Sequence, residues 1–216
     1  LFYTDGMTVY NKNHAIMPNG TGLLGHNSST QSGIIVKKPQ SNTIYYIFTI
    51  SGCTGPPGHG LHFSEVDLTL QAGLGDVNAN KNIQLFPFGC EKVTAILHQN
   101  GTDFWIVSRL ENSNTFRSYL LTSAGVINNI GAGVSPIETN IGPVYNNTYG
   151  YLKASGDGTK IAACYNPEFT LYDFDRATGI ISNEMIFPGS AYGAEFSPSG
   201  RFLYIAVEYP FIVSQY

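Results

Sequence analysis

The sequence predicts an all-β protein built from repeated, antiparallel sheets of four strands. Three observations predict this class: a strand–turn–strand unit recurs along the chain, the composition is rich in turn residues, and long apolar stretches with a helical period are missing. The 216 residues include 24 glycines and 11 prolines, and only 12% of them are charged. This composition suits short strands joined by tight turns and suits surface helices poorly.

The clearest repeat is a hairpin whose turn reads Ser-x-x-Gly. Residues 150–162 match residues 192–204 at an offset of 42, and the serine and the glycine of the two turns align. Weaker copies cover residues 93–107 and 34–48. Glycine supplies a positive φ in such turns, while Ser or Asp bonds the local backbone.

A third strand that ends in a turn is expected after each hairpin, followed by a more polar fourth strand. Residues 169–179 form the clearest third strand, and residues 116–125 repeat it. Residues 66–75 and 7–13 are looser copies, and residues 180–186 exemplify the fourth strand.

Four strands per unit, recurring every 40–60 residues or roughly so, predict a β-propeller of four-stranded antiparallel blades. We expect one domain over residues 1–216, present as a partial ring of three whole and two partial blades. A jelly roll or an immunoglobulin-like sandwich is the alternative, but neither predicts a recurring hairpin. The apolar runs 104–107 and 44–48 are expected near the central channel, buried on both faces. The predicted blades are 1–24 (partial), 33–86, 90–142, 149–187 and 192–216 (partial).

Charge and chain ends restrict the class of protein further. The net charge is −4, and the basic residues never cluster beyond Lys37-Lys38, so nucleic acid is not the expected partner. No apolar run approaches the roughly 20 residues of a spanning helix, and no signal peptide is recognised. The chain begins with a strand and a turn and ends inside another strand, so both ends look like cuts through a domain, and we expect a fragment of a longer polypeptide.

The turns resemble those of WD-like and TolB-like propellers, whose pattern is Ser-Pro-Asp-Gly. Residues 197–200 keep the proline of that pattern, and residues 155–158 keep the aspartate. This resemblance implies the fold and leaves the function open, because such hairpins occur in hydrolases, scaffolds and adhesins alike.

A second resemblance covers nearly the whole chain. Residues 1–11, 17–25, 45–49 and 150–155 look like the N-terminal propeller of large surface proteins of gliding bacteria. Those proteins often carry immunoglobulin- or PKD-like modules and a C-terminal sorting domain read by type IX secretion. The resemblance implies export to the cell surface or the medium, further domains on the same polypeptide, and other surface proteins or extracellular glycans as partners.

Three cysteines allow different interpretations. Cys53 and Cys90 fall in loops on one face of neighbouring blades, so they are candidates for a disulfide. Cys164 ends a second strand and is interpreted as a small buried hydrophobe. A zinc site made by Cys53, His59 and His62 is the alternative, but its spacing matches no known ligand pattern.

No enzyme motif is present, so we expect neither catalytic residues nor a metal or other cofactor. A site assembled from distant loops stays open, with Glu65 and Asp67, or Glu91 and Arg109, as carboxylate-bearing pairs.

The alternating carboxylates Asp173 and Asp175 could bind calcium, yet the rest of a calcium loop is missing. They are interpreted as turn residues, as are the asparagines of four Asn-x-Ser/Thr motifs.

A long loop over residues 51–62, with aromatic rings at the ends of second strands, is the expected ligand-binding region. The alternative is that the rings pack between blades. We therefore expect a non-enzymatic, cell-surface module for adhesion, binding or assembly. A polysaccharide- or peptide-processing enzyme with a site at the central channel, and a periplasmic or intracellular scaffold, are the alternatives. The candidate ligand-binding residues are Trp105, Tyr165, Tyr209, His59 and His62.

Overall fold

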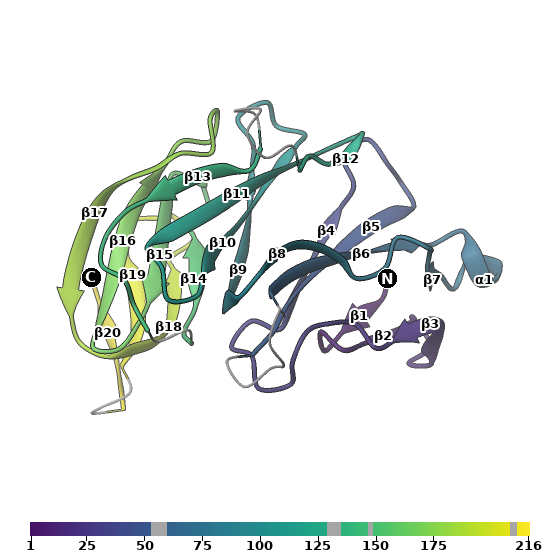
Figure 1. The fold of residues 1–216 in the computed structure, drawn as a ribbon, viewed down its shortest axis with the longest axis horizontal. Coiled ribbons are helices and arrows are strands. Elements are labelled where there is room, and N and C mark those ends of the chain that lie inside the picture. Colours follow the sequence, from purple (N-terminus) through teal and green to yellow (C-terminus); the bar gives the residue numbers. More distant parts are fainter. Residues whose placement is uncertain (53–59, 129–134, 147–148, 208–210) are drawn as a thin grey trace.

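The computed structural model describes residues 1–52, 60–128, 135–146, 149–207 and 211–216. Strands occupy 54% of these described residues and helix 2%, which confirms the all-β class. The described residues form five antiparallel sheets that follow one another in chain order, from the purple first sheet to the yellow fifth sheet in Figure 1.

The strands of each sheet are, from the first sheet to the fifth, β1 (Tyr3–Thr4), β2 (Thr8–Tyr10) and β3 (Ile16–Thr21); β4 (Gly33–Lys37), β5 (Ile44–Ile50), β6 (Gly60–Asp67), β7 (Asp76–Val77) and β8 (Ile83–Pro87); β9 (Gly89–Leu97), β10 (Phe104–Leu110), β11 (Thr115–Thr122), β12 (Gly125–Val126) and β13 (Ile137–Asn140); β14 (Leu152–Ala154), β15 (Lys160–Cys164), β16 (Glu168–Phe174) and β17 (Ile181–Pro188); β18 (Ala191–Phe196), β19 (Leu203–Val207) and β20 (Ile212–Gln215).

Strands that are neighbours in sequence are neighbours in each sheet, so the sheets are meanders of the expected kind. The fourth position differs from the prediction in two of them. In the second sheet β7 and β8 both pair with β6, and in the third sheet β12 and β13 both pair with β11. The fourth sheet has the single, more polar fourth strand that was predicted, β17.

The third strand of the second sheet lies earlier than predicted. The sequence placed it at residues 66–75 after a long loop, whereas β6 begins at Gly60 and has completed its pairing with β5 at Asp67. The Asp67 carboxylate then accepts bonds from the backbone N–H and the hydroxyl of Thr69, which starts a turn. A single turn with left-handed backbone, α1 (Leu70–Gly73), follows.

The continuous apolar runs also differ from their predicted place. They form β5 and β10, which are the second strands of their sheets and not the first strands, the position expected next to the central channel. Both are buried along most of their length, because neighbouring sheets cover both of their faces.

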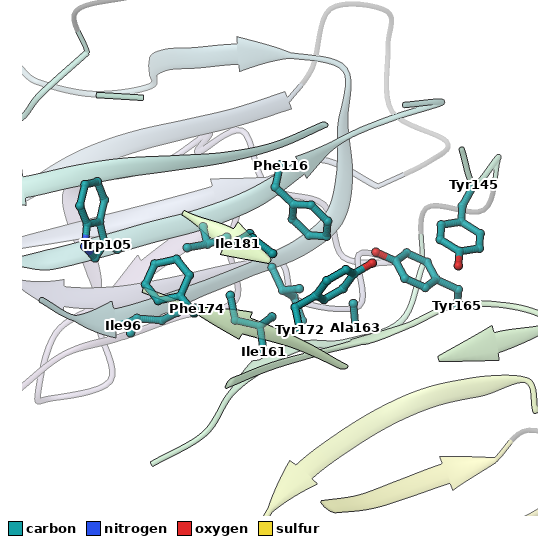
Figure 2. Close-up of a cluster of buried hydrophobic side chains, with 12 residues drawn as sticks. Ile96, Trp105, Phe116, Tyr145, Ile161, Ala163, Tyr165, Tyr172, Phe174 and Ile181 are labelled. Carbon is teal, nitrogen blue, oxygen red and sulfur yellow. The ribbon is translucent and has the colours of Figure 1, made fainter. Parts of the chain in front are cut away.

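Each pair of consecutive sheets shares an apolar core. Figure 2 shows the core between the third and fourth sheets, with Trp105 at one end and the stacked rings of Tyr145 and Tyr165 at the other. The Trp105 side chain is 2% exposed, and its Nε1 donates to the carbonyl of Arg176 at 3.0 Å. This ring therefore joins the two sheets by packing and by a hydrogen bond.

Replacement of Trp105 by alanine should lower the free energy of unfolding by about 3–5 kcal/mol, because a large cavity opens between the third and fourth sheets. Chemical denaturation followed by circular dichroism measures this loss. Val144→Ala is the control, since Val144 is 57% exposed, and it should change the stability by no more than about 0.5 kcal/mol. A loss below about 1 kcal/mol for Trp105→Ala would contradict the packing.

Candidate functional site

The first strands of the second to fifth sheets contact one another in chain order: β4 contacts β9, β9 contacts β14, and β14 contacts β18. We call the line along which these strands meet the axis. A pocket of about 550 Å³ lies between them, which is a size suited to a small ligand. We call it the axial pocket. Its lining residues are Gln31, Ile34, Val93, Thr94, Ala95, Leu152, Lys153, Ala154, Ser155, Gly156, Glu195, Phe196, Ser197 and Pro198.

The segment before β4 crosses one end of this pocket. Thr30 donates its backbone N–H to Glu91 Oε2 at 2.9 Å, and its hydroxyl oxygen lies 3.2 Å from the Tyr192 hydroxyl. The same hydroxyl accepts the backbone N–H of Gly150 at 3.1 Å. This one threonine, just before the second sheet, therefore contacts the third sheet, the segment that leads into the fourth, and the fifth.

Gln31 forms the floor of the axial pocket. Its backbone N–H donates to the carbonyl of Glu91 at 3.1 Å. Its carboxamide pairs with the backbone of Leu152: the Leu152 N–H donates to Oε1 at 2.8 Å, and Nε2 donates to the Leu152 carbonyl at 3.2 Å. The floor is thus fixed by three hydrogen bonds to β9 and β14.

Three polar side chains of the walls, Lys153, Glu195 and Ser155, have partners. Lys153 Nζ lies 2.7 Å from Glu195 Oε2, so the two charges on the lining neutralise one another. The Ser155 hydroxyl donates to Asp157 Oδ1 at 2.6 Å. This bond, together with the backbone N–H of Thr159, holds the pKa of Asp157 below its ordinary value.

Two buried cations, Lys92 and Arg109, lie between the third and fourth sheets. Lys92 donates its Nζ to the carbonyls of Tyr149 at 2.8 Å and Cys164 at 2.7 Å, and this Nζ stands 4.1 Å from the centre of the Tyr165 ring. Burial lowers the pKa of Lys92 from 10.5 to about 8. Arg109 is equally buried.

The Arg109 guanidinium donates hydrogen bonds to backbone carbonyls and lies over aromatic rings. Its Nη2 donates to Ser113 at 2.7 Å and to Pro143 at 2.6 Å, and its Cζ lies 4.7 Å from the centre of the Tyr145 ring. Arg109 Nη1 and the Tyr165 hydroxyl find no hydrogen-bond partner in the part of the chain that the structure describes. Burial raises the pKa of Tyr165.

Of the five predicted ligand-binding residues, the structure describes three, Trp105, Tyr165 and His62, and all three are buried. Trp105 and Tyr165 are buried in the core between two sheets, so neither ring offers a face to a ligand. His62 is 3% exposed and lies in β6, opposite Thr49, instead of in a loop. His59 and Tyr209 lie outside the described residues.

Two of the three cysteines, Cys90 and Cys164, are among the described residues, and both are buried. Cys164 is buried at the end of β15, as predicted. Cys90 is buried as well, with its Sγ 3.5 Å from the carbonyl of Leu110. Cys53 is outside the described residues, so its disulfide with Cys90 stays a prediction, and so does the alternative zinc site.

The other carboxylates that the sequence singled out have structural contacts. Glu65 accepts a hydrogen bond from Asn78, and Glu91 holds Thr30 as described above. Asp173 pairs with Lys160, and Asp175 accepts the backbone N–H of Ala177 at 2.8 Å in the predicted turn. Among the described residues, no group of three or more His, Cys, Asp or Glu side chains is placed to hold a metal ion.

None of the helices in the described part of the chain is long and apolar enough to cross a bilayer.

No protein-family model matches the chain, and no curated protein matches it. Solved structures of β-propeller proteins do. The periplasmic gluconolactonase of Pseudomonas aeruginosa is 14% identical, with a TM-score of 0.54 over 96% of this chain and 58% of that one. A Bacteroides uniformis protein whose proposed activity is that of a 6-phosphogluconolactonase is 12% identical, with a TM-score of 0.54 over 100% of this chain and 65% of that one.

The hydrazine synthase of Kuenenia stuttgartiensis is 12% identical, with a TM-score of 0.51 over 97% of this chain and 64% of that one. The chain therefore spans 58–65% of the length of these three proteins. At such identities the likeness shows the fold alone, and it identifies the sheets as those of a β-propeller.

The buried ammonium of Lys92 should make stability depend on pH. The pKa of Lys92 is lower in the folded chain than in the unfolded chain, so the unfolded chain binds more protons between about pH 8 and pH 10.5. The lysine therefore destabilises the fold below pH 8, and this penalty, about 3 kcal/mol, disappears as the pH rises to 10.5.

The measurement compares wild type with Lys92→Met by denaturation at pH 7.5 and pH 10, because other groups that titrate in this range are common to both proteins. The free energy of unfolding of wild type should rise relative to that of the variant as the pH rises. Lys12→Met, which removes an exposed lysine, is the control and should stay within about 0.5 kcal/mol of wild type at both pH values. A constant or falling difference would contradict a destabilising burial of the Lys92 ammonium.

Proposed function

We propose that this chain is a non-enzymatic binding module of an exported surface protein, with the axial pocket as its ligand site. The observation that carries the proposal is the state of the polar groups on the pocket lining. Lys153 and Glu195 neutralise each other, and Ser155 is bonded to Asp157. General acid–base or nucleophilic catalysis needs a group that is free to take or give a proton at the substrate, and this lining supports binding instead.

The five sheets are consecutive blades of one ring, of which this chain forms a part. Support comes from the shared apolar cores between consecutive sheets and from the first strands of four sheets that lie along one axis. The ranges of the five sheets lie close to the blades read from the sequence repeats. In this arrangement the axial pocket belongs to the central channel of the ring.

Export to the cell surface rests on the sequence. The resemblance to surface proteins of gliding bacteria covers nearly the whole chain, and the low share of charged residues is typical of exported proteins. Other surface proteins and extracellular glycans are the partners that this location offers. Further domains of the same polypeptide, including a sorting domain for type IX secretion, would place the module outside the cell.

A lactone hydrolase is the second candidate. Two of the similar structures carry lactonase activities in their names, and a volume of about 550 Å³ accommodates a sugar lactone. Lys153 and Glu195 are the charged groups of the lining, so they would have to carry the proton transfers.

A pH-stat assay with glucono-δ-lactone distinguishes the two candidates. Purified chain should leave the hydrolysis rate equal to the spontaneous rate in buffer, since Lys153, Glu195 and Ser155 already have partners. Glu195→Ala and Lys153→Ala are the matched variants. Acceleration by wild type that both variants abolish would overturn the binding module and establish the lactonase.

Export is tested by fractionating cells of the source organism and detecting the chain with an antibody. The protein should appear in the surface fraction or in the medium. Recovery with cytoplasmic markers would contradict export and favour an intracellular scaffold.

A further inference from the structure

The strands next to the axis have one unpaired edge. In β9 the ladder with β10 starts at the bond from His98 N to Asp103 O, at 2.8 Å. Because hydrogen-bonded and non-bonded pairs alternate in an antiparallel ladder, Thr94 and Ile96 bond to β10. Val93 and Ala95 therefore turn both their N–H and their C=O toward the axial pocket.

The same alternation holds in β14. Ser155 N donates to Lys160 O at 3.0 Å, and Cys164 N donates to Tyr151 O at 2.8 Å, so these residues face β15. Leu152 and Ala154 lie between them and turn their backbone groups toward the axis.

Gln31 shows what kind of group these edges accept. Its carboxamide takes both backbone groups of Leu152, and its backbone N–H takes the carbonyl of Glu91, which lies on the same edge of β9 as Val93 and Ala95. Gln31 thus bonds both edges, β9 through its backbone N–H and β14 through its carboxamide, with hydrogen bonds of the kind that an added peptide strand would make.

The next positions along both edges are open. Val93, Ala95 and Ala154 line the axial pocket directly beyond Gln31. Within the described ranges, no residue pairs with their axis-facing N–H and C=O groups. Val93 and Ala95 are two positions apart, which places their groups about 7 Å from each other, the repeat of an extended chain.

We propose that the axial pocket binds an extended peptide segment of about four residues, which pairs with the edge of β9 at Val93 and Ala95 and faces Ala154 on β14. The segment carries small, uncharged side chains, because Ile34 and Phe196 line the pocket and its two charged residues neutralise each other. This inference rests on the proposed function and adds the class of ligand.

The lining favours a peptide over a sugar. Sugars are held by exposed aromatic faces and by side-chain amides or carboxylates that are free to bond hydroxyls. The one aromatic ring of the lining, Phe196, is buried, and the carboxamide of Gln31 is engaged with Leu152. Open groups at the spacing of a strand match the alternating donors and acceptors of a peptide backbone.

The test uses the whole chain and the probe acetyl-Val-Ala-Val-Ala-amide. Calorimetry measures the Kd for the probe and for two isomers, one N-methylated at its first and third residues and the other at its second and fourth. The isomers have the same composition, but only one retains the N–H groups that face β9. Their Kd values should differ by at least tenfold, and the amide signals of Val93, Ala95 and Ala154 should shift on binding.

Ala95→Pro removes a backbone N–H that faces the pocket and loses no ladder bond, as an edge position allows. It should weaken binding about tenfold, whereas Ala95→Ser, which keeps the N–H, should bind as wild type does. If the proline variant does not fold, the isomer pair on wild type decides.

Equal affinities of the two isomers, no binding at millimolar probe, or shifts of these amides with maltotetraose alone would each overturn the peptide site. These outcomes leave the non-enzymatic module intact. Turnover of a lactone, in contrast, would contradict the non-enzymatic function whether or not the peptide binds.

Discussion

Burial of the second strands on both faces is the constraint on which the rest of the structure depends. In β10, Trp105 and Val107 pack toward the fourth sheet, while Ile106 between them packs toward the second sheet. In β15, Ile161 faces the third sheet and Ala162 faces the fifth. A strand with an apolar residue at every position is stable only between two other sheets. Each sheet therefore needs its neighbours, and the first strands are brought together at the axis.

This packing has a consequence for polar groups near the axis. The carbonyl of Tyr149, just before β14, and that of Cys164, at the end of β15, are enclosed by the neighbouring sheet and need donors there. Lys92 supplies these donors from the third sheet, although its ammonium is buried, and Thr30 and Gln31, just before β4, form further bonds to the fourth sheet and the residues before it. The polar residues at the axis thus hold the sheets in register and close one end of the pocket.

The sequence predicted the fold from local signals. The Ser-x-x-Gly turns at residues 155–158 and 197–200 form where the repeat placed them, because a turn depends on its own residues. The sequence did not decide the role of Trp105, because a tryptophan in an apolar run suits a binding surface as well as a core. Its partner is the carbonyl of Arg176, 71 positions away, and no local pattern indicates such a contact.

The sequence did not predict the axial pocket, because the pocket offers a ligand backbone groups and few free side chains. Searches for a site follow side chains with reactive groups, and those of this chain, such as Glu91 and Arg109, are occupied in holding sheets together. What the pocket offers a ligand is backbone, at residues as unremarkable in a sequence as Val93 and Ala95. An unpaired edge exists only because strand β9 is the first of its sheet and because the neighbouring sheets leave a space beside it. In this fold the binding chemistry is therefore a property of strand order, and the residues that a motif search would select are the ones that hold that order in place.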